Sequence, residues 1–317
     1  MSTPAPLSGP SSKNQHNGLL ATGTAFTLWG LLPVYWKFMY TVPSLQLLSH
    51  RTIWSLVLLF ILLLALGRVG EVKAALRVKR NLLCLAGGAV MLAVNWGVYI
   101  WAVTHDQLIE SSLGYYITPL VNVVLGCLVF KDRPKPLQIG AIALAATGVV
   151  VMVARYGHFP WLALTIALSF GLYGMLRKLA DVESIPGLFL ETAILAPFML
   201  VFLIRQEQLG LGAFLHRGLE IDGLLMLTGV VTSVPLILFA YGARRISFIT
   251  VGLLQYITPT MGFILGCFVY GEPFTPSHAI GFGFIWAALA LYTFDGLRRY
   301  KYDLKLRQKQ NKTGSYE

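Results

Sequence analysis

The sequence predicts an all-α membrane protein in which ten transmembrane helices form two inverted five-helix repeats. Three observations support this fold class. The chain is 56% hydrophobic and only 12% charged, whereas an average soluble domain is about a quarter charged. Its apolar residues are gathered into long runs. One apolar segment also occurs twice, beginning at residue 116 and again at residue 256.

Ten apolar runs are long enough to cross a bilayer, because about 20 apolar residues at 1.5 Å each span a hydrocarbon core of roughly 30 Å. The runs are expected to be helices, since lipid offers no partner for an unpaired peptide group. Transmembrane strands would alternate apolar and polar residues, and these runs do not. The expected spans are 19–39, 45–66, 82–103, 111–130, 137–155, 160–178, 187–205, 222–242, 248–270 and 277–295.

The two ends of the chain are expected to be polar cytoplasmic tails. Residues 1–18 are rich in Ser, Pro, Asn and Gln and predict a disordered tail. Residues 297–317 are strongly basic and are expected either to rest on anionic lipid or to be solvated. Between the tails, residues 19–155 form the expected first repeat and residues 156–296 the second.

The basic residues predict the orientation of the chain. If the N-terminus is cytoplasmic, 20 of the 25 Lys and Arg fall on the cytoplasmic side, four fall outside, and Arg51 lies within a span. Basic residues collect in cytoplasmic loops, so both termini are expected inside. The same rule accounts for the net charge of +11, and we expect no nucleic-acid partner.

The repeated segment indicates that the second half is inverted. Residues 116–136 placed over 256–276 give nine identities in 21 positions. Five spans separate equivalent positions, and an odd number reverses the direction of the chain. The loops agree, because "KDRPKP" (131–136) carries three basic residues and its mate "GEPFTP" (271–276) carries none. Inverted repeats of this kind build alternating-access transporters.

Three segments resemble a known family of transporters. They are "NWGVYIWAVTHDQLIESSLGYYITPL" (95–120), "LYGMLRK" (172–178) and "RRISFITVGLLQYITPT" (244–260). They resemble the RarD branch of the drug/metabolite transporter superfamily, whose repeats are called EamA domains. The resemblance extends from about residue 18 to 296. It implies a permease of the bacterial inner membrane that exports a small metabolite or drug such as an amino acid or a chloramphenicol-like compound.

Other classes of function receive less support from the residues. The chain has no Gly-rich phosphate loop, HExxH, paired metal-binding cysteines or GxSxG, so we expect neither an enzyme nor a bound cofactor or metal. The remaining alternative is a membrane scaffold or sensor that transports nothing. The sequence shows no soluble domain through which such a protein would signal.

The third expected span carries candidate residues for a substrate cavity. Asn95 and Tyr99 are four positions apart and share a helix face, with Trp96 beside them. Polar and aromatic groups on one face suit the wall of a cavity that holds a solute. The alternative is that Asn95 only hydrogen-bonds a neighbouring helix, which is worth roughly 1 kcal/mol.

Charged residues near the outer end are candidates for the transport pathway. His50 and Arg51 lie a few residues into the second span, and Lys37 ends the first. A charge inside a membrane costs about 3 kcal/mol and tends to mark a pathway. The alternative is that the side chains extend to the headgroups, which we expect of Lys37 more than of Arg51.

Glu191 is the corresponding candidate near the cytoplasmic end. It lies a similar depth into the seventh span, and Lys178 ends the sixth. One hypothesis is that Lys178 and Glu191 form a buried gate pair, in which loss of one member leaves an uncompensated charge. The other is that Glu191 carries a proton, since burial favours the protonated carboxyl.

The two repeated segments each contain a proline that is a candidate hinge. Proline removes a backbone hydrogen bond one turn upstream, and kinks in corresponding helices point to a transport site. Pro119 and Pro259 are therefore expected hinges, or alternatively fixed bends that aid packing. The residues just before them are further cavity candidates, namely Tyr115, Tyr116, Gln255 and Tyr256.

Overall fold

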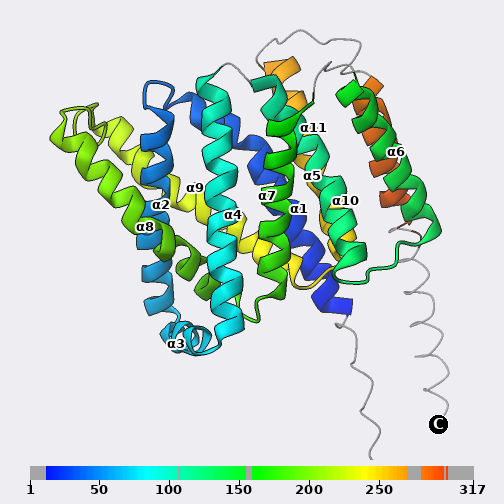
Figure 1. Ribbon diagram of the computed structural model, residues 1–317, viewed down its shortest axis with the longest axis horizontal. Coiled ribbons are helices and arrows are strands. Elements are labelled where there is room, and N and C mark those ends of the chain that lie inside the picture. The colour runs from blue at the N-terminus through cyan, green and yellow to red at the C-terminus, as the bar shows by residue number, and fades with distance from the viewer. Residues whose placement is uncertain (1–11, 106–107, 155–158, 270–279, 296–297, 299–317) are drawn as a thin grey trace, which may run out of the picture.

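The computed structural model describes residues 12–105, 108–154, 159–269, 280–295 and 298, and in this part the protein is a bundle of helices (Figure 1). The helices are α1 (Ser12–Lys37), α2 (Ser44–Ala65), α3 (Val69–Arg77), α4 (Lys79–Thr104), α5 (Leu108–Leu128), α6 (Pro136–Ala154), α7 (Trp161–Leu179), α8 (Ser184–Gln208), α9 (Leu219–Ala243), α10 (Phe248–Gln255) and α11 (Ile257–Ile264). A π-helical turn at Leu265–Val269 and an apolar helix at Ile280–Asp295 follow.

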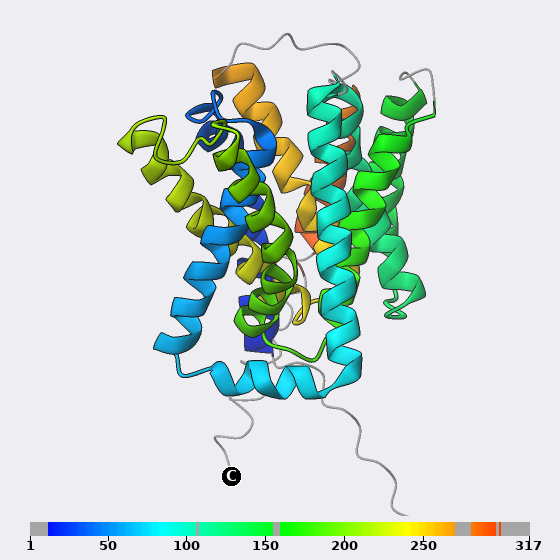
Figure 2. The same ribbon diagram turned by 60° about the vertical axis from the view of Figure 1, so that its left-hand side comes forward.

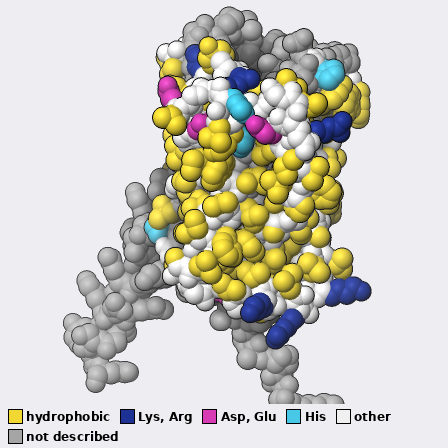
Figure 3. Space-filling model, turned by 90° about the vertical axis from the view of Figure 1, so that its left-hand side faces the viewer, with side chains coloured by type: hydrophobic (Ala, Val, Ile, Leu, Met, Phe, Trp, Pro, Cys, Tyr) yellow, Lys and Arg dark blue, Asp and Glu magenta, His cyan; other side chains and the backbone are white. Residues whose placement is uncertain are grey.

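The all-helical membrane fold is confirmed at the level of nine candidate spans and one shorter helix. Among the described residues, nine helical segments are long and apolar enough to cross a membrane, the last being Phe248–Val269. The tenth expected span, 277–295, corresponds to the shorter helix Ile280–Asp295. Figure 3 shows a broad apolar band between two ends that carry charged side chains, as a membrane-spanning bundle requires.

The structure corrects the sequence prediction at the start of the chain. Helix α1 begins at Ser12, so residues 12–18 are helical and do not belong to a disordered tail. The rest of that expected tail, residues 1–11, lies outside the described residues, as does nearly all of the expected C-terminal tail.

A short helix at one end of the bundle was not predicted. Helix α3 lies across the end at which α1 begins (Figure 2). It is amphipathic and buries Val72 and Ala75, which are three positions apart on one face. The Arg68 guanidinium, just before the helix, contacts Glu71 in its first turn at 2.6 Å. This arrangement places an anion near the positive helix N-terminus.

The two copies of the repeated segment differ in backbone. Helix α5 runs without interruption through Pro119, whereas the second copy breaks at Tyr256 into α10 and α11. Pro259 has no N–H to donate to the carbonyl of Gln255. At the break itself, the Tyr256 N–H bonds to the carbonyl of Leu253, three residues back, at 3.4 Å. The expectation of corresponding kinks is therefore met by a helix break in the second copy only.

Helix α5, which carries the first copy, packs beside α10, which directly precedes the second copy, and runs in the opposite direction. The Asp132 carboxylate, which follows α5, accepts the N–H of Phe248 at the start of α10 at 2.6 Å. Ten residues earlier, the amide of Asn122 donates to Gln255 at the end of α10 at 2.6 Å. Because the start of one helix contacts the end of the other, α5 and α10 are antiparallel.

Helices α1 and α7 each pack mainly against the opposite half of the chain. Helix α1 packs against α9 and α11, and α7 packs against α4 and α5. The close approaches are similar: a Cβ on Gly30 would lie 2.4 Å from Met261, and a Cβ on Gly171 would lie 2.6 Å from Val121. Glycine is required at both positions because the helices touch there. The two halves therefore meet through matching surfaces.

Candidate functional site

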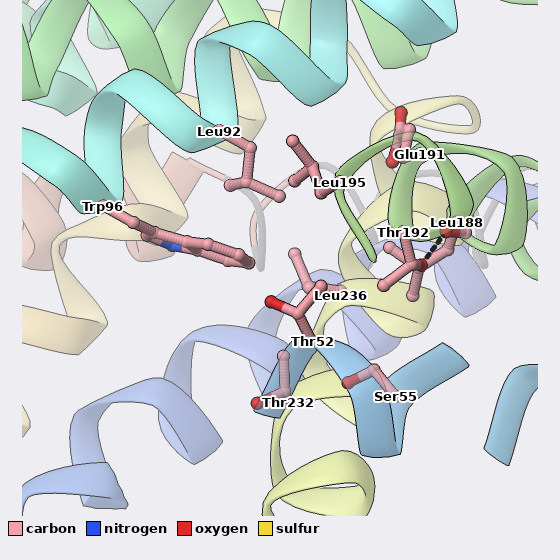
Figure 4. Close-up of a pocket in the computed structure, with 10 residues that line it drawn as sticks. All are labelled: Thr52, Ser55, Leu92, Trp96, Leu188, Glu191, Thr192, Leu195, Thr232 and Leu236. Atoms are coloured by element: carbon pink, nitrogen blue, oxygen red, sulfur yellow. Dashed lines mark hydrogen bonds between the residues drawn. The ribbon is translucent and has the colours of Figure 1, made fainter. Parts of the chain in front are cut away.

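A small cavity lies where α2, α4, α8 and α9 converge (Figure 4). The volume that the centre of a water molecule can occupy in this cavity is about 10 Å³. The cavity therefore has room for about one water molecule. The bundle is therefore nearly closed around its centre in this conformation. The lining residues are Thr52, Ser55, Leu92, Trp96, Leu188, Glu191, Thr192, Leu195, Thr232 and Leu236.

Most of the cavity lining consists of pairs of repeat-equivalent residues. The repeated segments begin at residues 116 and 256, which sets a separation of 140 positions between equivalent residues. Eight of the ten lining residues form four pairs with this separation. The pairs are Thr52 with Thr192, Ser55 with Leu195, Leu92 with Thr232, and Trp96 with Leu236. The cavity therefore lies between the two halves, and each half contributes the same helix positions.

Hydroxyl groups supply most of the polarity of the cavity. The Thr52 and Thr192 hydroxyls donate to carbonyls one turn earlier in their own helices. The Ser55 hydroxyl donates across to α9 at 3.3 Å. The Thr232 hydroxyl is buried and has no hydrogen-bond partner within the described residues. A solute or water in the cavity would satisfy this group, since a buried polar atom without a partner costs about 1–3 kcal/mol.

A buried ion pair closes one side of the cavity. The Glu191 carboxylate lies 3.6 Å from Nε of Arg177, and each side chain is 1% exposed. The Tyr173 hydroxyl donates to the same carboxylate at 3.4 Å, and Arg177 also donates to the carbonyl of Ser184. This cluster lies toward the end of the bundle where α3 is found, because it sits near the start of α8 and the end of α7.

The expected pairing of Lys178 with Glu191 is wrong. The Lys178 ammonium instead donates to the carbonyls of Ala243 at 2.6 Å and Ile246 at 2.5 Å, and it lies 5.3 Å from the ring centre of Phe130. On α7, successive residues point in directions about 100° apart. Arg177 therefore faces α8, whereas Lys178 faces the end of α9.

Arg51 lies on the other side of the cavity in an aromatic environment. Its guanidinium carbon is 4.0 Å from the ring centre of Trp96, which lines the cavity, and 5.9 Å from that of Trp36. The phenol groups of Tyr99 and Tyr115 lie near it. The rings of these two tyrosines are 6.3 Å apart. Four of the predicted site residues are thus brought together here.

Asn95 faces a neighbouring helix. Its amide donates to the carbonyl of Ile166 at 2.9 Å and to the hydroxyl of Ser169 at 3.1 Å, both on α7. The residue is buried and is not among the cavity-lining residues. Of the two alternatives for Asn95, the contacts match the interhelical hydrogen bond.

Tyr116, Gln255 and Tyr256 do not line the central cavity. Tyr256 is fully buried against α6 and the helix Ile280–Asp295. The Tyr116 ring lies 5.5 Å from that of Phe282 on the same side. Gln255 accepts a hydrogen bond from Asn122 at the contact between α5 and α10. The repeated segments therefore hold the bundle together and do not form the cavity wall.

The other two predicted pathway residues lie near the end opposite α3. Lys37 is exposed at the end of α1. The His50 ring is buried and lies 5.5 Å from the ring of Phe214. Neither residue is among those that line the cavity.

Comparison with known proteins identifies the family. Residues 16–154 and 160–294 each match the EamA-like transporter family. The chain belongs to this family. The two matches divide it into two EamA repeats, as the repeated segment predicts.

The chain is also similar to named bacterial proteins of this family. It is 43% identical to the "Uncharacterized transporter YojE" of Bacillus subtilis, over 89% of this chain and 95% of that protein. It is 35% identical to "Protein RarD" of Escherichia coli K12, over 90% and 97%. It is 30% identical to the "Chloramphenicol-sensitive protein RarD" of Pseudomonas aeruginosa, over 89% and 95%. This EamA-family protein is therefore a multi-pass membrane transporter and not an enzyme.

A solved structure shows the same fold. A crystal structure of a protein with 18% sequence identity superposes with a TM-score of 0.67, over 88% of this chain and 98% of that one. At this identity the likeness supports the fold alone.

Several residues of the site in this EamA-family protein were not predicted from the sequence. They are Thr52, Ser55, Tyr173, Arg177, Thr192 and Thr232. One signal was available, because Thr52 and Thr192 are identical residues separated by the distance between the repeats. The ion pair gave no such signal, because it joins α7 to α8 and the equivalent positions in the first half carry different residues.

The two sides of the cavity differ in how tightly they are closed. Glu191 and Arg177 are each 1% exposed, whereas Tyr99 is 37% and Tyr115 38% exposed. The residues at the α3 end of the cavity are therefore more fully enclosed than the two tyrosines near Arg51.

Proposed function

We propose that the protein is a secondary transporter that moves a small metabolite or drug across the bacterial inner membrane by alternating access. Its ten helices form two inverted repeats, its termini are cytoplasmic, and the direction of net transport is export. The range of candidate solutes includes amino acids and chloramphenicol-like compounds, and the Pseudomonas aeruginosa relative is named "Chloramphenicol-sensitive protein RarD".

The observation that carries this proposal is the pairing of cavity residues across the halves. Transporters with inverted repeats hold their substrate near the midplane between the repeats, and four equivalent pairs line this cavity. The unequal enclosure of the two sides agrees with one state of an alternating cycle. The antiparallel packing of α5 and α10 agrees with inversion.

Within this proposal, Glu191 acts as part of a gate. Its carboxylate is paired with Arg177 and contacted by Tyr173, which supports a gate more than a proton carrier. Opening toward the α3 end would separate α7 from α8 and break the pair.

Transport by purified protein in proteoliposomes tests the proposal. A panel that contains amino acids and chloramphenicol is assayed with and without a proton gradient, using wild-type protein and Thr192→Leu, which removes a hydroxyl from the cavity wall. The matched control is Thr147→Leu, because Thr147 is exposed on α6 and its hydroxyl also bonds a carbonyl one turn earlier.

We expect wild-type protein and Thr147→Leu to move at least one solute, and Thr192→Leu to be impaired. Absence of transport of every solute by wild-type protein would contradict the proposal. A scaffold or sensor would instead retain its cellular phenotype when cavity residues are replaced.

A further inference from the structure

Arg51 is a partly buried cation for which the described residues provide no anion. Its guanidinium stacks on Trp96, and the neutral phenol groups of Tyr115 and Tyr99 lie near it. No carboxylate of the described residues forms an ion pair with it, and its Nε is buried without a hydrogen-bond acceptor.

The aromatic rings stabilise the positive charge of the guanidinium but leave its N–H groups without hydrogen-bond acceptors. A ring face attracts the positive charge but accepts no strong hydrogen bond from the guanidinium edge. The N–H groups of arginine form a planar fork that matches the two oxygens of a carboxylate or phosphate. A cation held inside a membrane bundle without an anion tends to mark a substrate pathway.

The equivalent position in the second half carries the opposite charge. Glu191 follows Arg51 by the same 140 positions that separate the repeats, and its charge is already balanced by Arg177 at 3.6 Å. Of the residues that line the cavity, Glu191 is the one with an ionisable carboxylate. The site as a whole therefore keeps one uncompensated positive charge, and this charge is on the less enclosed side.

We propose that the transported solute carries a negatively charged group, a carboxylate or a phosphate, which pairs with Arg51 while an apolar part of the solute packs against Trp96 and the cavity leucines. This proposal rests on the proposed transport function and narrows its substrate to small amphipathic solutes that carry such a group, which favours amino acids over chloramphenicol, a compound without a carboxylate or phosphate. Leu92, Leu195 and Leu236 supply the apolar wall, and the Thr232 hydroxyl is available to a further polar group.

Matched probes test the charge requirement on the purified full-length protein. The probes share one apolar part: 3-phenylpropanoate is the acid, 3-phenylpropanamide the neutral form and 3-phenylpropylamine the cation. A fourth probe, 2-phenylethyl phosphate, distinguishes a phosphate from a carboxylate. Binding is measured by thermal stabilisation and by quenching of tryptophan fluorescence, for which Trp96 is placed beside Arg51.

Three variants accompany the wild-type protein. Arg51→Gln removes the charge, and Arg51→Lys keeps the charge without the planar fork. Arg205→Gln is the control, because Arg205 is an exposed cation in the last turn of α8. We expect the acid or the phosphate to bind wild-type protein and Arg205→Gln roughly tenfold to a hundredfold more tightly than the amide or amine, as a charge-assisted hydrogen bond allows.

Arg51→Gln is expected to lose this preference, and Arg51→Lys to keep part of it. The proposal is overturned if neither anion binds wild-type protein, if the amide or amine binds equally well, or if Arg51→Gln binds the anions unchanged. Should Arg51→Gln fail to give a monodisperse protein, the anion preference of wild-type protein and its reduction in Arg51→Lys decide the question. Transport of neutral solutes at equal rates by wild-type protein and Arg51→Lys would overturn the anion proposal and leave the transport function standing.

Discussion

The buried pair of Arg177 and Glu191 allows a quantitative prediction. Its charged atoms are 3.6 Å apart and both side chains are 1% exposed. At an effective dielectric constant of about 20, this separation gives an attraction of about 4–5 kcal/mol before desolvation is counted. Removal of one member leaves a buried charge without a partner, which costs about 3–5 kcal/mol.

The perturbation is a double-mutant cycle with Arg177→Met, Glu191→Gln and the double variant. We expect Arg177→Met to lower the free energy of unfolding by about 3–5 kcal/mol. The double variant should be more stable than the sum of the single changes implies, by about 2–3 kcal/mol, because neither charge remains. The free energy is measured by denaturation or steric trapping in bicelles.

A more exposed pair provides the control for this cycle. Arg244 and Glu183 lie 3.1 Å apart, but their side chains are 19% and 38% exposed. Surface ion pairs contribute about 0–1 kcal/mol, so the cycle with Arg244→Met and Glu183→Gln should show little coupling. Additivity within about 0.5 kcal/mol for the buried pair, or an Arg177→Met variant as stable as wild type, would refute the reasoning.

Two further predictions concern packing between the halves. Gly30→Ala should destabilise the protein by about 1–3 kcal/mol through overpacking, because the added Cβ would lie 2.4 Å from Met261. The control is Gly23→Ala in the same helix, which meets open space and should be neutral or stabilising by up to about 1 kcal/mol. Equal melting temperatures of the two variants in detergent would contradict this prediction. Asn122→Leu and Gln255→Leu should each cost about 0.6–1.7 kcal/mol through loss of their 2.6 Å hydrogen bond, and the double variant should cost little more than either alone. Strict additivity in the same bicelle assay would show that the two side chains act separately.

The sequence predicted the fold well because membrane spans depend on local properties. Apolar length alone decides whether a segment can cross a bilayer, and the expected spans correspond to the helices α1, α2, α4 to α9 and Phe248–Val269. Helix α3 was missed because a nine-residue amphipathic helix at the end of a bundle has no long apolar run. The start of α1 at Ser12 was missed because its polar first turns do not resemble a span.

The residues of the site were harder to predict, because they depend on helix rotation. Tyr115 and Tyr116 are neighbours in the sequence, yet Tyr115 interacts with Arg51 and Tyr116 packs on Phe282. Similarly, Arg177 rather than Lys178 pairs with Glu191. A rotation of about 100° per residue sends adjacent side chains to different neighbours, and composition carries no information about which neighbour each one meets.

By itself, the sequence determined the presence and approximate limits of most spans, the presence of two repeats and the family. These follow from hydropathy along the chain and from similarity between segments, which need no knowledge of contacts. The tertiary structure alone decided which helices converge on the cavity, which repeat-equivalent residues line it, and which of the buried charges has a partner. Those properties depend on packing between helices far apart in the sequence, where a change of one position along a helix exchanges one neighbour for another.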